Sequence, residues 1–419
     1  MIQGCKSMIT AVDADVLIVG AGIMGLTIAR ELVRNNWENI VVIEKEAETG
    51  KHASGRNSGV LHAGIYYAPD SLKAKSCLNG NFLMKAYCRE KQLPLSETGK
   101  VIVARSEDEL PVLQTLYERA ITNGAKVDML NEKELAAIEP NAKTVQHAIY
   151  SHYTAVVDRN KILKSLKSDL EGSGKVRFLF NCAFETVVAS DVVQTQCGRI
   201  RFKRFINAAG AHCDRISKAF GIGVQYRLIP FKGIYRKLKK NSAWRVRGSI
   251  YPVPDIRNPF LGVHFTRNIH GDVYLGPTAI PAFGRENYGV FEGIDKEAID
   301  ILLSDAHLFL NNPQFRTVAL TEPRKYFFPW FFQDAAALVK TLDPSEVEPA
   351  AKVGIRAQLV NWNTGELVQD FQVIQDGDCL HLLNPISPAF TSSMDLAQKI
   401  VQLIMKNKNE PQMNTDTHR

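Results

Sequence analysis

Residues 15–46 read DVLIVGAGIMGLTIARELVRNNWENIVVIEKE, and this stretch decides the fold of the chain. It begins with DVLIVG, an apolar run of strand length, and continues with IMGLTIARELVRN, in which apolar residues recur at helical spacing. A second apolar run of strand length, NIVVIEK, follows the helical segment. A strand, a helix and a strand in this order predict a βαβ unit with two parallel strands.

The turn between the first strand and the helix carries three glycines, Gly20, Gly22 and Gly25, in the pattern G-x-G-x-x-G. The first permits a tight turn, the second lets the backbone approach a pyrophosphate, and the third allows close packing of helix and strand. Glu44 ends the second strand, where its carboxylate can accept hydrogen bonds from ribose hydroxyls. Together these features predict a dinucleotide site, with Ile23 and Lys45 as neighbouring contacts.

The chain has 419 residues, which is enough for two domains, and 45% of them are hydrophobic. Its formal charge of +7 suits anionic ligands, but the first dense basic patch is RKLKK at 236–240, so no nucleic-acid partner is expected. The seven cysteines form no CxxC pattern, which favours a reducing compartment over disulfides or a metal site. No signal peptide, transit peptide or apolar stretch of about 18–20 residues is apparent, so we expect a cytoplasmic protein.

The chain leaves the nucleotide-binding pattern after the second strand and returns to it twice. The first return is INAAGAHCDRIS at 206–217, and the second is the strand CLHLLN with the loop and helix that follow it. An NAD domain usually continues directly into a second mononucleotide half. Long excursions with returns instead favour a flavoprotein, in which distant segments contact an extended FAD.

We therefore predict an α/β (α+β) fold with a discontinuous Rossmann-type FAD-binding domain and a smaller substrate domain of antiparallel sheet plus helices. The FAD-binding domain comprises residues 13–90, 150–220 and 350–408. The substrate domain comprises residues 91–149 and 221–349, because residues 225–290 have strand-like patterns and 295–345 have helical ones. The termini, residues 1–12 and 409–419, are expected to be flexible.

Several motifs resemble those of the D-amino-acid-oxidase-like superfamily of FAD enzymes, and more narrowly those of the L-2-hydroxyglutarate dehydrogenase/oxidase family. The segments that carry this resemblance are NSGVLHAGIYYAPDSLKAKSC (57–77), GSIYPVPD (248–255), PFLGVHFT (259–266), YLGPTAIPAFGRENY (274–288) and VGIRAQLV (353–360). The resemblance extends from about Asp15 to the final helix. It implies FAD-dependent oxidation of L-2-hydroxyglutarate to 2-oxoglutarate, with hydride transfer to flavin N5 and electrons passed to a quinone-type acceptor or oxygen.

The resemblance also implies that SGRNSGVLHAGIYY, residues 54–67, runs along the cofactor from pyrophosphate to flavin. This segment is too glycine-rich for a good helix, and a glycine-rich surface loop is the alternative. Its expected contacts to phosphate and ribitol oxygens are Ser54, Arg56, Asn57, Ser58 and Gly59. The expected contacts from the returns are Phe184, Ala209, Gly210, Ser387 and Ser392. Ser392 and its neighbours Thr391 and Ser393 are also plausible N-caps of the last helix.

Oxidation of a 2-hydroxy acid requires a base for the hydroxyl proton and cations for the carboxylates. His62 and His264 are the candidate bases, because a histidine of ordinary pKa is largely neutral at working pH and both lie in distinctive family segments. His381 is third in line, and a structural role is the alternative for each. Arg356 is the candidate carboxylate ligand, since arginine can bind carboxylates in bidentate fashion. The further candidate substrate contacts are Tyr67, Lys232, Tyr235 and Arg267.

Two alternatives within the FAD fold stay open, an amino-acid oxidase and a non-catalytic FAD-binding module. The three separated nucleotide-binding segments argue against a third, an NAD-dependent dehydrogenase. A quinone acceptor implies peripheral contact with the inner membrane face. The aromatic run YFFPWFFQ at 326–333, with Trp330, Phe331 and Phe332, is a candidate for that contact, although a buried core is the favoured interpretation.

Overall fold

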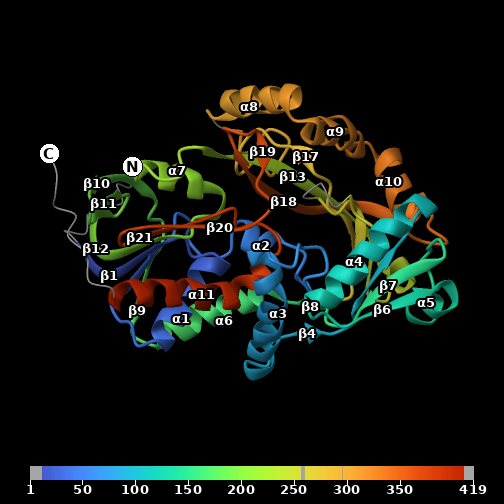
Figure 1. Cartoon of the computed structure of the whole chain (residues 1–419), viewed down its shortest axis with the longest axis horizontal. Coiled ribbons are helices and arrows are strands. Elements are labelled where there is room, and N and C mark those ends of the chain that lie inside the picture. The colour runs from blue at the N-terminus through green and yellow to red at the C-terminus, as the bar shows by residue number, and fades with distance from the viewer. Residues whose placement is uncertain (1–11, 256–259, 295, 410–419) are drawn as a thin grey trace, which may run out of the picture.

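The computed structural model describes residues 12–255, 260–294 and 296–409. Within these residues the strands form three sheets, of eight, ten and three strands. The eight-stranded and ten-stranded sheets lie side by side (Figure 1). The predicted flexible termini, residues 1–12 and 409–419, lie outside the described residues apart from Val12 and Asn409.

The predicted βαβ unit forms the centre of the eight-stranded sheet. β1 (Val12–Val19) pairs in parallel with β2 (Ile40–Ile43), and α1 (Ile23–Arg34) connects them. β2 is buried throughout, as an apolar strand of a parallel sheet should be. The other strands are β9 (Val176–Leu179), β10 (Phe184–Ala189), β11 (Val192–Thr195), β12 (Gly198–Asn207), β20 (Gln372–Asp376) and β21 (Cys379–Leu383).

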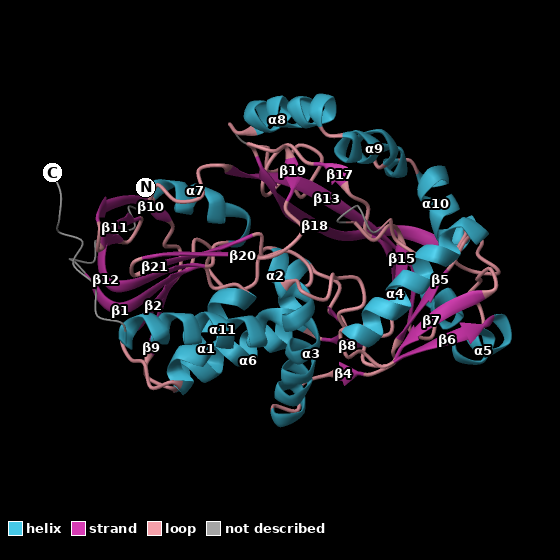
Figure 2. Cartoon of the chain, in the orientation of Figure 1, coloured by secondary structure: helices cyan, strands magenta, loops and turns pink. Residues whose placement is uncertain are grey.

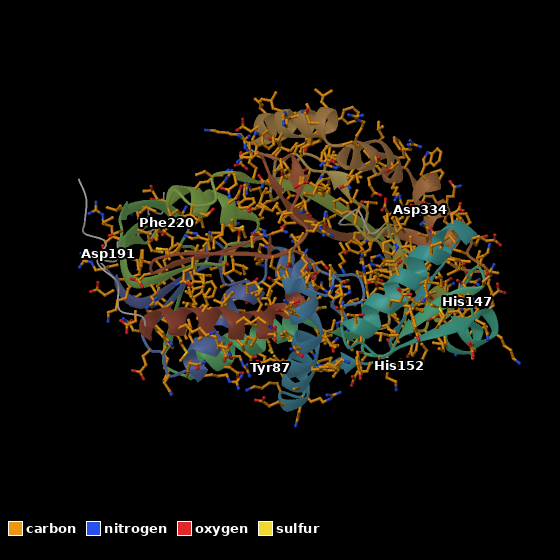
Figure 3. The ribbon with its side chains drawn as sticks, in the orientation of Figure 1. Tyr87, His147, His152, Asp191, Phe220 and Asp334 are labelled. Atoms are coloured by element: carbon orange, nitrogen blue, oxygen red, sulfur yellow. The ribbon has the colours of Figure 1, made fainter. Side chains whose placement is uncertain are left out.

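Both faces of the eight-stranded sheet are covered. Three helices, α1, α6 (Arg159–Gly172) and α11 (Ala389–Asn409), lie along one face, and α3 (Leu72–Glu90) packs against α11 (Figure 2). On the other face Phe220 follows α7 (Cys213–Ala219) and packs against Phe205 (Figure 3). The predicted βαβ unit and the predicted strand and helix near the C-terminus are therefore present in this half.

The ten-stranded sheet is built on one long antiparallel pair. β13 (Tyr226–Leu238) pairs with β18 (Val347–Asn361) along its whole length. The other strands are β5 (Lys100–Val103), β6 (Val127–Asn131), β7 (His147–Ser151), β14 (Ser249–Pro252), β15 (His264–Arg267), β16 (Val273–Gly276), β17 (Ile280–Pro281) and β19 (Glu366–Leu367). The predicted antiparallel sheet is confirmed, except that β14 pairs with β5 in parallel.

Helices cover the outer side of this second half. They are α4 (Leu110–Thr122), α5 (Glu132–Ile138), α8 (Ala298–Asn311), α9 (Pro313–Thr321) and α10 (Phe328–Ala336). The last three run in succession along one edge of the molecule (Figure 1). The small third sheet joins β3 (Val60–Leu61), β4 (Leu95–Ser96) and β8 (Ala155–Val157). In the part of the chain described here, no helix combines the length and the apolar character that crossing a membrane requires.

The domain boundaries remain a prediction, and the sheets suggest one change to them. β18 begins at Val347 and belongs to the ten-stranded sheet, so residues 350–361 lie with the substrate strands. β20, which begins at Gln372, belongs to the eight-stranded sheet. β19 (Glu366–Leu367) still belongs to the ten-stranded sheet, so we propose that the boundary lies between 368 and 371 instead of at 350.

Candidate active site

The glycine turn packs too closely for side chains at two of its positions. Gly20 has a φ of +105°, and a Cβ there would lie 2.6 Å from the carbonyl oxygen of Ala208. A Cβ on Gly25 would lie 1.9 Å from the carbonyl oxygen of Gly20. Glu44 is fixed above the turn, because its Oε2 accepts a hydrogen bond from the backbone N–H of Ala21 at 2.9 Å. The turn and the acidic residue are therefore placed as the dinucleotide motif requires.

The segment after β2 lies against the first turn of α1. Its first part forms one helical turn, α2 (Ala53–Arg56), where the sequence predicted none. Ser54 Oγ accepts a hydrogen bond from the N–H of Ile23 at 2.9 Å. Asn57 Oδ1 accepts one from the N–H of Gly59, which has a φ of +78°. These bonds bring the segment to the helix N-terminus, where a phosphate would bind.

Two of the residues predicted to contact the cofactor, Arg56 and Lys45, are cations that already interact with other protein groups. Arg56 donates from Nε to the carbonyl oxygen of Lys51 at 2.8 Å, and its guanidinium lies 3.8 Å from the ring centroid of Tyr288. Lys45 Nζ forms an ion pair with Glu286 at 2.7 Å. Arg56 still borders the cavity described below, whereas Lys45 does not.

The first return brings Ala209 and Gly210 to the cofactor side of the eight-stranded sheet. Gly210 has a φ of +56°, and a Cβ there would meet open space. The backbone N–H of Cys182 donates to the carbonyl oxygen of Glu44 at 2.8 Å, which places Phe184 near the same end of β2. The adenosine side of the predicted site is thus assembled from β2, β10 and β12.

The second return differs from the prediction in where its helix begins. α11 starts at Ala389, and the N–H of Ser392 already donates to the carbonyl oxygen of Pro388. Thr391, Ser392 and Ser393 therefore lie inside the helix, and their prediction as N-caps is wrong. Gly80 on α3 sets this position, because a Cβ there would lie 2.3 Å from the carbonyl oxygen of Thr391.

These segments border one cavity of about 260 Å³. Its cofactor side is lined by Ile23, Ser54, Arg56, Asn57, Ser58, Gly210, Ser387 and Thr391. Its other end is lined by His62, which follows β3, and by Tyr235, Tyr251, His264 and Arg356 of the ten-stranded sheet. Two residues that line the cavity carry a buried polar atom with no hydrogen-bond partner among the described residues, His62 at Nδ1 and Arg356 at Nε. Buried polar atoms are normally paired, so the glycine turn and these atoms fit a bound dinucleotide and an anionic ligand.

The two candidate bases line the cavity together. Burial, with a smaller effect of the positive charge of Lys100, lowers the pKa of both His62 and His264 to about 3, so both rings are neutral near pH 7. His264 Nδ1 lies 2.8 Å from the carbonyl oxygen of Gly262, which can only accept. In the neutral ring Nδ1 therefore carries the proton, and Nε2 is left as an acceptor. His381 is buried against Phe220 and does not line the cavity.

The register of β13 and β18 separates two candidate cations. Arg356 pairs with Phe231, and Lys232 pairs with Ile355. Adjacent residues of a strand point to opposite faces of the sheet, so Arg356 lines the cavity and Lys232 points away from it. Lys232 Nζ donates to the carbonyl oxygen of Gly289 at 2.6 Å. The prediction that Lys232 contacts the substrate is therefore wrong.

Of the remaining predicted substrate contacts, two tyrosines lie at or beside the cavity and one arginine does not. Tyr235 lines the cavity. Tyr67 lies beside it, close enough for the charge of Arg356 to act on its phenol. Arg267 donates from Nη1 to the carbonyl oxygens of Ala243 and Val246, at 2.9 and 3.0 Å, and is a structural residue. Its prediction as a substrate contact is wrong.

A buried lysine that no sequence motif indicated lies behind the cavity wall. Lys100 is 1% exposed, and its Nζ donates to the phenol of Tyr66 at 3.1 Å. The ammonium lies 4.5 Å from the Tyr66 ring centroid and 4.6 Å from that of Tyr251. The sequence GKVIV shows only a lysine at the start of an apolar strand, which is usually an exposed position, and both tyrosines come from distant segments.

Comparison with known proteins is consistent with this geometry. The profile of the family described as "FAD dependent oxidoreductase" (DAO) matches residues 15–361. The human protein named "L-2-hydroxyglutarate dehydrogenase, mitochondrial" is 35% identical, with 96% of this chain and 91% of that protein covered. A protein of Indibacter alkaliphilus named L-2-hydroxyglutarate dehydrogenase is 34% identical, with 94% of this chain and 99% of that protein covered.

Solved structures share the fold at lower identity. An L-α-glycerophosphate oxidase from Mycoplasma pneumoniae with FAD bound gives a TM-score of 0.71 at 22% identity, covering 94% of this chain and 95% of that one. A glycine oxidase from Geobacillus kaustophilus gives a TM-score of 0.68 at 18% identity, with the same coverage of both chains. The family profile and the curated relatives together confirm the predicted resemblance. This chain belongs to the DAO family of FAD-dependent oxidoreductases and, within it, to the L-2-hydroxyglutarate dehydrogenase family.

Proposed function

We propose that this chain oxidises L-2-hydroxyglutarate to 2-oxoglutarate and passes the electrons to a quinone-type acceptor. The observation that carries the proposal is the inner end of the cavity. A buried arginine and two neutral histidines meet there, next to the segments that fit FAD. The names of the curated relatives support the choice of this substrate.

The cofactor is held by the segments that border the other side of the cavity. The N-terminus of α1, against which Ser54 is hydrogen-bonded, would face the pyrophosphate, and Glu44 beside the glycine turn would accept hydrogen bonds from the ribose. Bound FAD supplies the hydride acceptor. The chain's own residues orient the hydroxy acid, take its hydroxyl proton and exclude water.

The proton is accepted by His62 or His264. A base must be unprotonated to work, and burial gives both rings that state. His264 also has a defined tautomer with Nε2 as the acceptor, whereas His62 Nδ1 has no partner among the described residues. Substitution of each histidine by glutamine separates the two. The base variant loses the reductive half-reaction, and the other variant changes substrate affinity.

Arg356 binds one carboxylate of the substrate. Its guanidinium is buried, and burial lowers its pKa to about 10, so it remains charged near pH 7. The unpartnered Nε and the position on β18 leave it available to a ligand in the cavity. Tyr235 lines the same region and can donate a hydrogen bond from its phenol.

An exposed apolar surface on α8, α9 and α10 supports peripheral membrane contact and a quinone acceptor. Its exposed side chains include Ile299, Leu302, Leu303, Leu310, Leu320, Tyr326, Phe327 and Trp330. The aromatic run at 326–333 is exposed only in part: Trp330 is 51% exposed, whereas Phe331 is 1% exposed. Exposed apolar side chains gathered on successive helices are a feature of interaction sites. Co-sedimentation with anionic vesicles should weaken in Trp330→Ala and remain unchanged in Trp244→Ala, which removes an exposed tryptophan elsewhere.

An anaerobic titration of the FAD-loaded protein with L-2-hydroxyglutarate tests the reaction. Loss of the flavin absorbance near ~450 nm is expected with the L-isomer and not with the D-isomer or an L-amino acid. Bleaching by the amino acid alone would make the chain an amino-acid oxidase. A flavin unchanged by all three compounds would refute the proposed oxidation.

A further inference from the structure

Lys100 is a buried cation without a carboxylate partner. It opens β5, and no ion pair to it is present among the described residues. Its ammonium is held by the phenol of Tyr66 and by the faces of the Tyr66 and Tyr251 rings. A buried ammonium is unfavourable unless it is paired, so its retention in this position points to a functional role.

The ammonium stands directly behind the candidate bases. The ring of Tyr251 stacks on that of His264, with centroids 3.8 Å apart and an interplanar angle of 24°. The Tyr251 ring that stacks on His264 is therefore also the ring over which the Lys100 ammonium lies. Its charge also acts on His62. One lysine is therefore coupled to both histidines.

The groups that face this cluster come from several elements. Cys77 on α3 interacts electrostatically with Lys100, and Lys352 on β18 acts on His264. Burial lowers the pKa of Lys100 to about 7 and raises that of Cys77 to about 12. The thiol is therefore neutral near pH 7, and Lys100 is charged in part. An anion in the cavity favours its charged form.

We propose that Lys100 is a positioning residue for the oxidation. Its ammonium holds Tyr251 against His264 and supplies a positive charge behind both histidines, on which substrate binding and proton acceptance depend. The proposal rests on the proposed function, since it requires a dicarboxylate in the cavity. Lys100 does not line the cavity and acts only through Tyr251 and through its field.

Lys100→Met tests the proposal, because methionine keeps most of the volume and removes the charge. Lys85→Met is the matched control. Lys85 is equally buried, but its ammonium pairs with Glu97 at 2.8 Å and donates to the carbonyl oxygen of Tyr153 at 2.8 Å. Both variants are purified with FAD bound. The measurements are the melting temperature, kcat/KM between pH 3.5 and 9, and the affinity for glutarate, a dicarboxylate with no hydroxyl to oxidise; the range extends to low pH because the pKa of both histidines is about 3.

We expect Lys100→Met to melt at or above the wild-type temperature, because an unpaired buried charge is removed. Its glutarate affinity should fall about tenfold, and the acid limb of kcat/KM should move to higher pH by roughly one unit. Lys85→Met should melt at a lower temperature with the acid limb unchanged. A purely structural lysine would produce the Lys85 pattern at both positions.

A wild-type pH profile and glutarate affinity in Lys100→Met would overturn the proposal. If that variant does not fold, the same measurements are made on Lys100→Arg, which keeps the positive charge. An unchanged acid limb then supports the role of the charge, and a shifted limb contradicts it. A wild-type protein that binds glutarate but does not oxidise L-2-hydroxyglutarate would count against the proposed function instead.

Discussion

Asp214→Asn should destabilise the protein strongly, because it removes one charge of a buried ion pair. The side chains of Asp214 and Arg285 are 2% and 8% exposed. Arg285 binds the carboxylate through both terminal nitrogens, with Nη2 and Oδ2 3.1 Å apart. The same carboxylate accepts a hydrogen bond from the N–H of Leu228. The pair joins the helix after the first return to the loop between β17 and α8.

Removing one partner of a buried ion pair costs about 3–5 kcal/mol, because the other charge is left buried. Two features put the expected loss in the free energy of unfolding of this variant at the low end of that range, about 3 kcal/mol. Arg285 retains an ion pair with Glu297 at 2.8 Å and a hydrogen bond to the carbonyl oxygen of Ala211. Asparagine can also still accept one of the lost hydrogen bonds. About 3 kcal/mol corresponds to a fall in melting temperature of roughly 6–12 °C for a domain of 150–250 residues.

The assay is the melting temperature of the FAD-loaded protein, followed by both tryptophan and flavin fluorescence. Arg215→Gln is the control, since Arg215 also pairs with Glu297 but is 43% exposed. Exposed pairs contribute about 0–1 kcal/mol, so the control should melt within about 2–4 °C of wild type. Ala211 lines the cavity, and flavin release should therefore accompany the lower melting temperature. If Asp214→Asn melts no lower than Arg215→Gln, the reasoning about the buried pair is wrong.

Three further predictions concern the cavity. Gly80→Ala should lower FAD retention, measured as flavin per protein after dialysis, because its Cβ would lie 2.3 Å from the carbonyl oxygen of Thr391 and displace the start of α11. Arg356→Met should lower kcat/KM for the diacid by about 30-fold or more, the loss of one charge-assisted contact of about 2 kcal/mol, whereas Lys232→Met should change it less than threefold. Acid should destabilise the protein between pH 6.5 and about 3, because the two cavity histidines stay neutral when folded and bind protons when unfolded. Urea unfolding at pH 7, 6 and 5 should show this loss of unfolding free energy. Replacing either histidine by glutamine should reduce the change in unfolding free energy by up to about 1.4 kcal/mol per pH unit.

The cofactor half of the molecule could be predicted from the sequence because its signals are local. The apolar strands, the helix and the glycine spacing of residues 15–46 all lie within one βαβ unit, and β1, α1 and β2 follow them. The last helix shows where local signals are insufficient. Serines and threonines at 391–393 have the composition of an N-cap, but the helix already begins at Ala389, where its packing against Gly80 sets the start.

The substrate side could be predicted only in part, because it depends on pairing between distant strands. The sequence predicted Lys232 in the substrate domain and Arg356 in the FAD-binding domain. In the structure they lie on paired strands of one sheet, and the β13–β18 register shows that they point to opposite faces. Lys100 could not be found at all. Its burial requires Tyr66 and Tyr251 to close over it, and they are far from it in the sequence.

One loop links cofactor binding to the position of the second sheet. The loop between β17 and α8 carries Arg285, Glu286 and Tyr288, and each of these contacts a different cofactor-facing segment. The partners are the helix after the first return, the end of β2, and α2 respectively. A cofactor that orders these three segments therefore also orders the loop, and with it the attachment of β17 and β13 above the cavity. Because His264 and Arg356 lie on strands of that same ten-stranded sheet, the contacts that retain FAD also hold these two substrate groups against it.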